Sequence, residues 1–334
     1  MSTNQPTIPT ARAPRIPRRH FLGSAAVLTA ALPLAAATAG GATVHPGQAR
    51  PQARAGRTRF WPDGAQLVIS VSMQFEAGAQ PERGASGPFP PLDPKYPDYP
   101  LQSWYTYGVR EGIPRLLDLW DRTGIKVTSH MVGQAVERHP ELAREIVARG
   151  HEASGHGQTW EPQYSMSAET ERASYVQSID TIQRATGTRP LGFNAFWMRG
   201  SPDTLPILQS LGFLYHIDDL SRDEPSVLQV GGKPFAVVPY TVRNNDIVRF
   251  DSPSTTAEDM LGELKAEFDV LYAEGARRRR MMSISTHDRI SGSPARVRAL
   301  EAFIRYAQGH AGVTFMRKDD IARFALGASG MPAA

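Results

Sequence analysis

Segments with the pattern of buried strands alternate with segments of helical pattern along most of this chain, and this alternation limits the folds open to it. Residues 67–73 are the clearest strand, because apolar and small side chains follow one another without a charge. Further strands are predicted at residues 126–132, 213–217, 227–230, 235–238, 281–286 and 313–315. Helices are predicted at residues 140–148, 168–185, 257–274, 294–308 and 319–324. Strands separated by helices predict a parallel barrel or a doubly wound sheet.

The length and composition of the chain fit one large domain. Of its 334 residues, 41% are hydrophobic, which is enough for a single α/β core. We therefore expect residues 59–326 to form one domain and residues 327–334 to be a C-terminal tail. The sequence shows no tandem repeat that would divide this span.

The positive charge of the chain is concentrated before the predicted domain. The first 60 residues contain eight arginines and no acidic residue, and without these arginines the formal net charge of +4 becomes −4. The basic character therefore gives no support to a nucleic-acid partner. The chain contains no cysteine, so we expect its stability to depend on the core and not on disulfides.

The basic N-terminal segment has the pattern of an export signal. Arg18 and Arg19 precede an apolar, alanine-rich run at residues 21–37, and Ala37-Thr38-Ala39 resembles a cleavage site. We expect residues 1–39 to be a twin-arginine signal peptide and residues 40–58 a disordered linker, which places the mature protein in the periplasm or outside the cell. The apolar run is short for a membrane span, although a retained N-terminal anchor is the alternative.

Residues 79–108 are expected to form a long loop, because they are rich in proline, glycine and aromatic residues. A loop of this length in a compact domain is usually a lid or a binding loop. Trp104 lies near its end. The alternative is a flap that covers hydrophobic side chains of the barrel.

Three polar side chains follow predicted strands at the point where each strand ends. Glu76 follows the first strand, His156 lies between two glycines at the end of a short strand that comes after the helix at 140–148, and His287 follows the strand at residues 281–286. Because the carboxyl ends of parallel strands meet at one mouth of a barrel, these side chains are expected to lie close together. A carboxylate facing imidazoles provides the proton transfers that amide hydrolysis needs.

Four segments, in the same order, resemble the polysaccharide deacetylase (NodB-homology) family, especially its branch that includes metal-independent allantoinases. They are GHEASGHG at residues 150–157, TGTRPLG at 186–192, PY at 239–240 with ND at 245–246, and TH at 286–287 with GSPAR at 292–296. The resemblance covers approximately residues 60–324. It implies a distorted (β/α)7-type parallel barrel in a single domain, and hydrolytic removal of an N-acetyl group from an amino sugar.

The sequence departs from the family pattern at the expected metal site. The metal-dependent members have two neighbouring acids after the first strand and a second histidine four residues after the first, whereas this chain has only Glu76 there and has Trp160 at the histidine position. Three ligands, Glu76, His156 and His130, could still hold a divalent metal such as zinc. The alternative for His130 is a neutral histidine in the core. The alternative for the whole site is catalysis without a metal.

The resemblance also implies roles for other residues. Glu76 matches either the catalytic base or a metal ligand, Arg189 matches an arginine that orients the catalytic acid, and His287 matches the general acid. We expect the adjacent Asp288 to raise the pKa of His287. The predicted substrate-binding residues are Trp104, Trp160 and Asn194, with buried packing as the alternative for the two tryptophans.

These features together predict an exported hydrolase of non-peptide carbon–nitrogen bonds. An N-deacetylase of an amino-sugar polymer or oligomer is the first interpretation. The alternatives are a metal-independent hydrolase of cyclic amides, like the allantoinases, and a carbohydrate-binding protein that has lost its activity. A glycan or small-molecule substrate is the expected partner, and the oligomeric state is not determined by the sequence.

Overall fold

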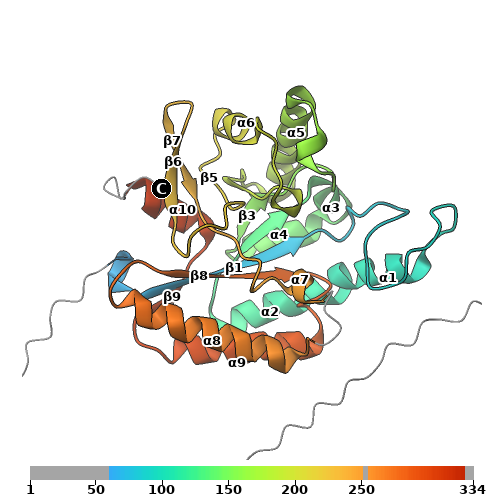
Figure 1. Cartoon of the computed structure of the whole chain (residues 1–334). Helices are drawn as coiled ribbons and strands as arrows, with labels where there is room; N and C mark the ends of the chain where they lie inside the picture. The colour runs from blue at the N-terminus through green and yellow to red at the C-terminus, as the bar shows by residue number, and fades with distance from the viewer. Residues whose placement is uncertain (1–59, 251–254, 328–334) are drawn as a thin grey trace, which may run out of the picture. The chain divides into compact units, whose positions relative to one another are not determined.

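A computed structural model of the chain describes residues 60–250 and 255–327 (Figure 1). The predicted signal peptide at 1–39, the predicted linker at 40–58 and all of the predicted tail except Gly327 lie outside the described residues. The described part forms the distorted barrel that was predicted, with a mainly parallel sheet that curls into half a barrel and helices around it.

The sheet is organised around β1 (Leu67–Phe75), which lies between two parallel neighbours. These are β2 (Thr128–Met131) and β8 (Met281–His287), and β9 (Val313–Phe315) pairs with the first residues of β1. In this register Gln74 of β1 lies opposite both His130 and His287. The carboxyl ends of β1, β2 and β8 therefore lie side by side at Gln74.

The sheet continues from β2 through four short parallel strands. These are β3 (Glu152–Gly155), β4 (Gly192–Phe193), β5 (Tyr215–His216) and β7 (Lys233–Val237). The edge strand β6 (Ser226–Val230) is antiparallel to β7, so the sheet is not wholly parallel. The predicted strands at 227–230 and 235–238 form this hairpin.

The two faces of β1 differ in polarity. Ile69, Val71 and Met73 point to the helical side and belong to the largest hydrophobic cluster. The alternate residues Ser70, Ser72 and Gln74 are buried inside the barrel, where their side chains form hydrogen bonds. The interior face of β1 is therefore polar at Ser70, Ser72 and Gln74, whereas its outer face packs against apolar side chains.

Helices cover the outer side of β1 and β8. They are α2 (Ile113–Thr123), α8 (Ala257–Gly275) and α9 (Pro294–Gln308), which Figure 1 shows below these strands. The other half carries α4 (Pro140–Ala148), α5 (Ala168–Thr186), α6 (Thr204–Ser210) and α10 (Lys318–Gly327).

Local signals explain where these helices begin. The side chain of Ser167 accepts a hydrogen bond from the backbone of Thr170 at the start of α5, and Thr256 forms a capping box with Asp259 at the start of α8. Gly187, with φ of 75°, ends α5 in the left-handed conformation. These local features make the helix bounds readable from the sequence.

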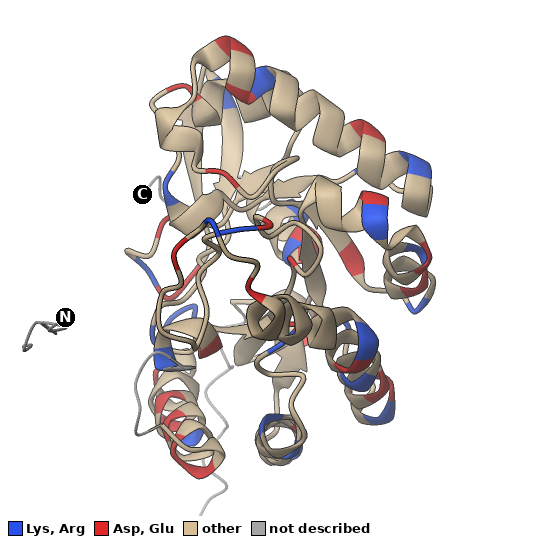
Figure 2. Cartoon of the chain, turned by 90° about the vertical axis from the view of Figure 1, so that its right-hand side faces the viewer, with Lys and Arg blue, Asp and Glu red and all other residues tan. Residues whose placement is uncertain are grey.

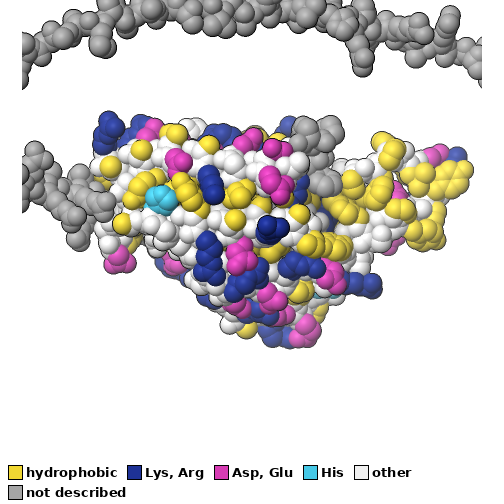
Figure 3. Space-filling model, turned by 90° about the horizontal axis from the view of Figure 1, so that it is seen from below, with side chains coloured by type: hydrophobic (Ala, Val, Ile, Leu, Met, Phe, Trp, Pro, Cys, Tyr) yellow, Lys and Arg dark blue, Asp and Glu magenta, His cyan; other side chains and the backbone are white. Residues whose placement is uncertain are grey.

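The segment expected to be a long loop contains a helix. Residues 99–107 form α1 (Tyr99–Tyr107), whose N-terminus is capped by the side chain of Asp98, and a π-helical turn at Gly108–Gly112 joins it to α2. The prediction of a loop to residue 108 was therefore wrong for α1. Phe89, Leu92, Tyr96 and Tyr99 are exposed here, and yellow side chains gather at this end of the molecule in Figure 3.

Two further short helices were not predicted, α3 (Gly133–Arg138) and α7 (Asp246–Phe250). Acidic and basic residues are interspersed over the helices in Figure 2. Within the described ranges, none of the helices has the length and apolar character needed to cross a membrane.

Candidate active site

Glu76 lies at the centre of a cluster at the carboxyl ends of β1, β3 and β8. Its side chain is buried, and its Oε1 atom lies 3.5 Å from Nε2 of His156 and 3.6 Å from Nε2 of His287. Its Oε2 atom accepts a hydrogen bond of 2.9 Å from Arg289. The structure thus brings together the three residues that the sequence placed at strand ends.

The surroundings of Glu76 favour its ionised form. Burial alone would raise the pKa of this carboxyl group, but the charges of His287 and Arg289 lower the pKa well below its usual range. Glu76 is therefore a fixed negative charge between two imidazole rings at neutral pH.

His287 is held by Asp246, the first residue of α7. Its Nδ1 atom lies 2.5 Å from Oδ1 of Asp246, and Oδ2 of the same carboxylate accepts hydrogen bonds from the backbone N–H groups of His287 and Ser291. Burial opposes the charged ring, but Asp246 and Glu76 raise the pKa of His287 above its usual value. The geometry thus favours an imidazolium with its Nε2–H directed toward Glu76.

Asp288 does not have the role that was expected for it. Its carboxylate accepts hydrogen bonds from the backbone N–H groups of Glu76 and Ala77, at 3.1 Å and 2.9 Å, and so holds the end of β1. Asp246 supplies the charge that raises the pKa of His287. The prediction for Asp288 was wrong because its side chain points to the end of β1 and not to the ring of His287.

His156 is oriented by a backbone carbonyl. Its Nδ1 atom lies 2.7 Å from the carbonyl oxygen of Asn194. Since a carbonyl oxygen only accepts, Nδ1 carries the hydrogen in this contact, and the neutral ring then has its lone pair on Nε2, facing Glu76. His156 and His287 therefore present nitrogens of different character to the same carboxylate.

Arg289, and not the predicted Arg189, contacts the carboxylate of Glu76. Arg189 precedes β4, is exposed and donates a hydrogen bond to the carbonyl of Leu211, so it lies at the wrong end of a strand to reach Glu76. Arg289 contacts Glu76 instead, across 213 residues of sequence. The prediction for Arg189 was wrong. The one signal for Arg289 was its place two residues after His287.

Arg289 is enclosed by aromatic rings as well as by carboxylates. Its guanidinium carbon lies 4.9 Å from the ring centre of Trp104, 4.5 Å from that of Tyr105 and 5.4 Å from that of Trp160. Trp104 and Tyr105 belong to α1, so the helix missing from the sequence prediction forms part of the site.

Glycines allow the turn after His287 to pack closely on the π-helical turn. A Cβ atom at Gly112 would lie 1.9 Å from the carbonyl oxygen of Asp288, and one at Gly108 would lie 2.8 Å from the Asp288 carboxyl group. Only glycine is compatible with this close approach. The position of Arg289 beside α1 thus depends on residues far away in the sequence.

A neutral network lies beside the charged cluster. Nε2 of Gln74 donates to the hydroxyl of Tyr240 at 2.7 Å and to Oδ1 of Asn194 at 3.3 Å, and Nδ2 of Asn194 donates to Asp218. Sequence reasoning did not select Gln74 and Tyr240, although Tyr240 lies in one of the matching segments. Asn194 lies at the site as predicted, with its amide group already hydrogen-bonded inside the protein.

The predicted metal ligands do not fit a metal ion. The ring of His130 is buried in the barrel interior, where its Nε2 atom lies 3.3 Å from the hydroxyl of Ser72, and burial lowers its pKa well below the usual value. The guanidinium of Arg289 donates a hydrogen bond to Oε2 of Glu76, so this oxygen is already engaged within the protein. Over residues 60–250 and 255–327, no three His, Cys, Asp or Glu side chains form a group that could hold a metal.

The neutral core histidine, the alternative reading of His130, agrees with this geometry. Proton transfer at this site can be carried by Glu76, His156 and His287 of the chain itself.

The cluster opens into a pocket of about 460 Å³, whose lining includes Glu76, His156, His287 and Asn194. Trp160 and Trp197 form part of its rim. Trp104 lines an adjoining pocket, so two of the predicted substrate-binding residues lie at this pocket and one beside it. Arranged in this way, the residues can move protons to and from a group bound in a largely enclosed space.

Comparisons with known proteins agree on the family of the fold. Residues 102–216 match the family model described as polysaccharide deacetylase. Two solved structures, one titled a probable polysaccharide deacetylase from Pseudomonas aeruginosa and the other an allantoinase, each share 34% sequence identity with this chain and have a TM-score of 0.75. Each comparison covers 83% of this chain and 95% of the solved one.

A peptidoglycan deacetylase from Helicobacter pylori is 31% identical over 136 residues, which are 40% of this chain and 46% of that protein. This match is local, whereas those with the two solved structures extend over nearly their whole length.

Proposed function

The chain belongs to the polysaccharide deacetylase family, whose members hydrolyse non-peptide carbon–nitrogen bonds, and from this membership we propose that it removes N-acetyl groups from an amino-sugar oligomer or polymer. The observation that carries the proposal is the convergence of His156 and His287 on Glu76. Amide hydrolysis needs one group that accepts a proton from water and another that gives a proton to the leaving nitrogen.

The proposed reaction uses the two histidines in different states. A water molecule attacks the amide carbon and passes a proton to the free lone pair on Nε2 of His156. His287, protonated at the start, donates its Nε2 proton to the nitrogen, the carbon–nitrogen bond breaks, and acetate and an amine are formed. Glu76 stabilises the positive charge on either ring, since its Oε1 lies within 3.6 Å of both nitrogens.

The tryptophans of the pocket support a sugar substrate. Trp160 and Trp197 lie at the rim, and Trp197 is 50% exposed. Indole rings present an apolar face on which the C–H face of a sugar can stack. The acetamido group would then enter the pocket toward Glu76 while the sugar ring stays at the rim.

We also propose that the protein is exported by the twin-arginine route and acts in the periplasm or outside the cell. Arg18-Arg19 and the cleavage pattern at residues 37–39 support this location. Changing both arginines to lysine should leave the precursor in the cytoplasm, and N-terminal sequencing of the exported form should begin near Gly40. Normal export of that variant would exclude this route.

A metal-independent hydrolase of cyclic amides is the second candidate. Two observations favour it, the 34% identity to an allantoinase and the poor fit of the site to a metal. The proton transfers would be the same, but the bond broken would lie in a small ring. Such a substrate would need only the catalytic pocket.

Assays on the purified mature protein distinguish these candidates. We expect acetate release from N-acetylated chito-oligosaccharides, and we expect turnover to persist after treatment with a chelator and in protein that elemental analysis shows to be metal-free. Ring opening of allantoin without acetate release would support the second candidate. Binding of oligosaccharide without either reaction would instead indicate an inactive carbohydrate-binding protein.

A further inference from the structure

The peptide group between Asn194 and Ala195 connects a carboxylate to His156. The carbonyl oxygen of this peptide lies 2.7 Å from Nδ1 of His156. The N–H group of the same peptide, which belongs to Ala195, donates to Oδ1 and Oδ2 of Asp218 at 3.0 Å and 3.2 Å. The side chain of Asn194 also donates to Oδ1 of Asp218, at 2.9 Å. Asp218 therefore binds the N–H side of the peptide whose carbonyl side holds His156.

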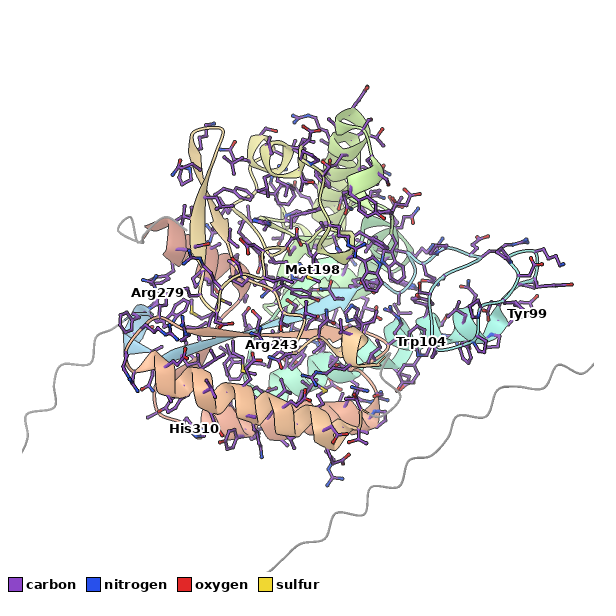
Figure 4. The ribbon with its side chains drawn as sticks, viewed as in Figure 1. Tyr99, Trp104, Met198, Arg243, Arg279 and His310 are labelled. Atoms are coloured by element: carbon purple, nitrogen blue, oxygen red, sulfur yellow. The ribbon has the colours of Figure 1, made fainter. Side chains whose placement is uncertain are left out.

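The three strands that carry these residues are neighbours in the sheet. His156 follows β3, Asn194 follows β4 and Asp218 lies two residues after β5, and β4 pairs with both other strands. The wall of the catalytic pocket continues from Asn194 and Ala195 to Met198, which is labelled in Figure 4. The backbone N–H of Met198 donates to the carbonyl of Ala195 at 2.9 Å. Hydrogen bonds on both sides of Ala195 therefore hold the peptide in place.

Asp218 lies behind the wall of the catalytic pocket. It is not one of the lining residues, and its side chain is only 10% exposed. The ring of His216 lies near it, but Nδ1 of this ring is 3.8 Å from Oδ2 of Asp218, which is too far for a hydrogen bond. The carboxylate of Asp218 is thus directed at Asn194 and Ala195, and any effect on a bound substrate must pass through them.

A carboxylate at the N–H side of a peptide strengthens the carbonyl side as an acceptor, because hydrogen bonds in a chain polarise one another. A stronger acceptor keeps the hydrogen of His156 on Nδ1 and the lone pair on Nε2. Carboxylates often orient histidine rings by direct contact, as Asp246 does with His287. At His156 a neutral peptide lies between the carboxylate and Nδ1, so the ring is oriented there without a direct ion pair.

We infer that Asp218 is a positioning residue for His156. Through the peptide between Asn194 and Ala195, it keeps the hydrogen of the neutral ring on Nδ1, so that Nε2 can accept a proton from water. The effect on rate rests on the proposed hydrolytic function, whereas the tautomer is a property of the protein without substrate. Direct contact with Asp246 then suits His287 to be the acid, and indirect contact with Asp218 suits His156 to be the base.

Nitrogen NMR of the histidine side chains tests the inference, because it distinguishes a ring nitrogen that carries hydrogen from one that does not. The signals of His156 are those that disappear in His156→Gln. In the wild type we expect the neutral ring to carry its hydrogen on Nδ1. Asp218→Asn keeps the size of the side chain and removes its charge, and it should lower the ratio of the Nδ1–H to the Nε2–H form by about fivefold, a change within the range of one hydrogen bond. The signals of His287 should not change.

Turnover provides a second measurement. We expect Asp218→Asn to lower kcat for acetate release by about 10–100-fold, the cost typical of removing an outer partner of a functional histidine. KM should stay within about threefold, because His156 acts on the attacking water. Asp219→Asn is the matched control, since Asp219 is the next residue and accepts a hydrogen bond from the backbone N–H of Ser221 at 2.8 Å. This control should leave the tautomer of His156 unchanged and kcat within about twofold.

The tautomer separates this inference from the proposed function. A wild-type ring that carries its hydrogen mainly on Nε2 would overturn the inference without any variant. An unchanged tautomer in folded Asp218→Asn or Asp218→Ala would overturn it too, even if the wild type releases acetate. A shifted tautomer in either variant, with none in Asp219→Asn, would support the role of Asp218 even if no acetate is released, and only the proposed reaction would then fail.

Discussion

Glu76 and Glu152 are buried at opposite ends of the strands, and their surroundings shift their pKa values in opposite directions. Glu76, at the carboxyl end of β1, has its pKa lowered, although burial acts to raise it, because His287 and Arg289 lie beside it. Glu152 begins β3 at the other end of the strands, and burial together with the charge of Asp319 raises its pKa to about 8. Burial and a neighbouring negative charge therefore favour the neutral carboxyl group, and a permanent charge at Glu76 requires cations placed beside it.

The hydrogen-bond partners of Glu152 are neutral donors. Thr128 and Tyr215 each donate to it from their hydroxyl groups at 2.7 Å, and the backbone N–H of Asp319 donates at 3.0 Å. Lys318 is buried nearby, but burial lowers its pKa to about 7, which weakens it as a counter-charge. The buried polar groups around Glu152 therefore support the fold, whereas those around Glu76 form the candidate active site.

The largest expected effect comes from removing the charge of Glu76. Glu76→Gln keeps the shape of the side chain but no longer stabilises a positive imidazole ring, so we expect kcat to fall by about 10²–10⁴. Glu152→Gln is the control and should change kcat by less than about threefold. Steady-state acetate release measures both variants. Equal loss of activity in the two would mean that the ends of the barrel do not differ in function.

Asp246→Asn should have the next largest effect. Asp246 raises the pKa of His287, and a general acid must be protonated to act, so this pKa sets the alkaline limb of the pH–rate profile. The variant lowers the pKa of His287. We expect the alkaline limb to move to lower pH, so that kcat falls more at pH 8 than at pH 6 and by about tenfold at the higher pH. An unshifted limb would remove His287 as the acid.

Glu152→Gln should change stability and not rate. The unfolded carboxyl group has a pKa of 4.5 and the folded one about 8, so between these values the unfolded chain releases a proton that the folded protein keeps. The free energy of unfolding of the wild type should therefore fall as pH rises from 4.5 to 8. We expect the variant to gain on the order of 3 kcal/mol relative to wild type across this range.

Urea unfolding of both proteins at pH 5 and pH 8 measures this difference. The gain should be largest at pH 8, where the wild type begins to ionise a buried group. A constant difference at the two pH values would show that Glu152 does not titrate in this range.

The smallest effect is expected at Arg189. Arg189→Ala removes one exposed hydrogen bond to Leu211, so activity should stay within about twofold and the free energy of unfolding within about 0.5 kcal/mol. Arg289→Ala is the comparison, because it removes the guanidinium that is hydrogen-bonded to the buried Glu76 carboxylate and should cost about 3–5 kcal/mol. Thermal unfolding measures the stability of both variants, and acetate release measures their activity. Similar effects of both would restore the role that the family resemblance implied for Arg189.

The sequence by itself determined most of the longer elements and the main reactive groups. The helices at 140–148 and 294–308 and the strand at 313–315 match the structure residue for residue, because prolines at the first helical turns and nearby glycines act locally. Glu76, His156 and His287 were found because parallel strands place their carboxyl ends together, which is a rule of the fold.

Only the tertiary structure decided which groups surround Glu76. Arg289 reaches it across 213 residues, and Asp246 reaches His287 across 41, distances over which no local pattern extends. His130 follows the alternation of β2 into the barrel interior, where its Nε2 atom contacts the hydroxyl of Ser72. The pattern of a strand predicts to which face a side chain points. The partner of that side chain, and therefore its state of charge, depends on which other segment folds against the strand.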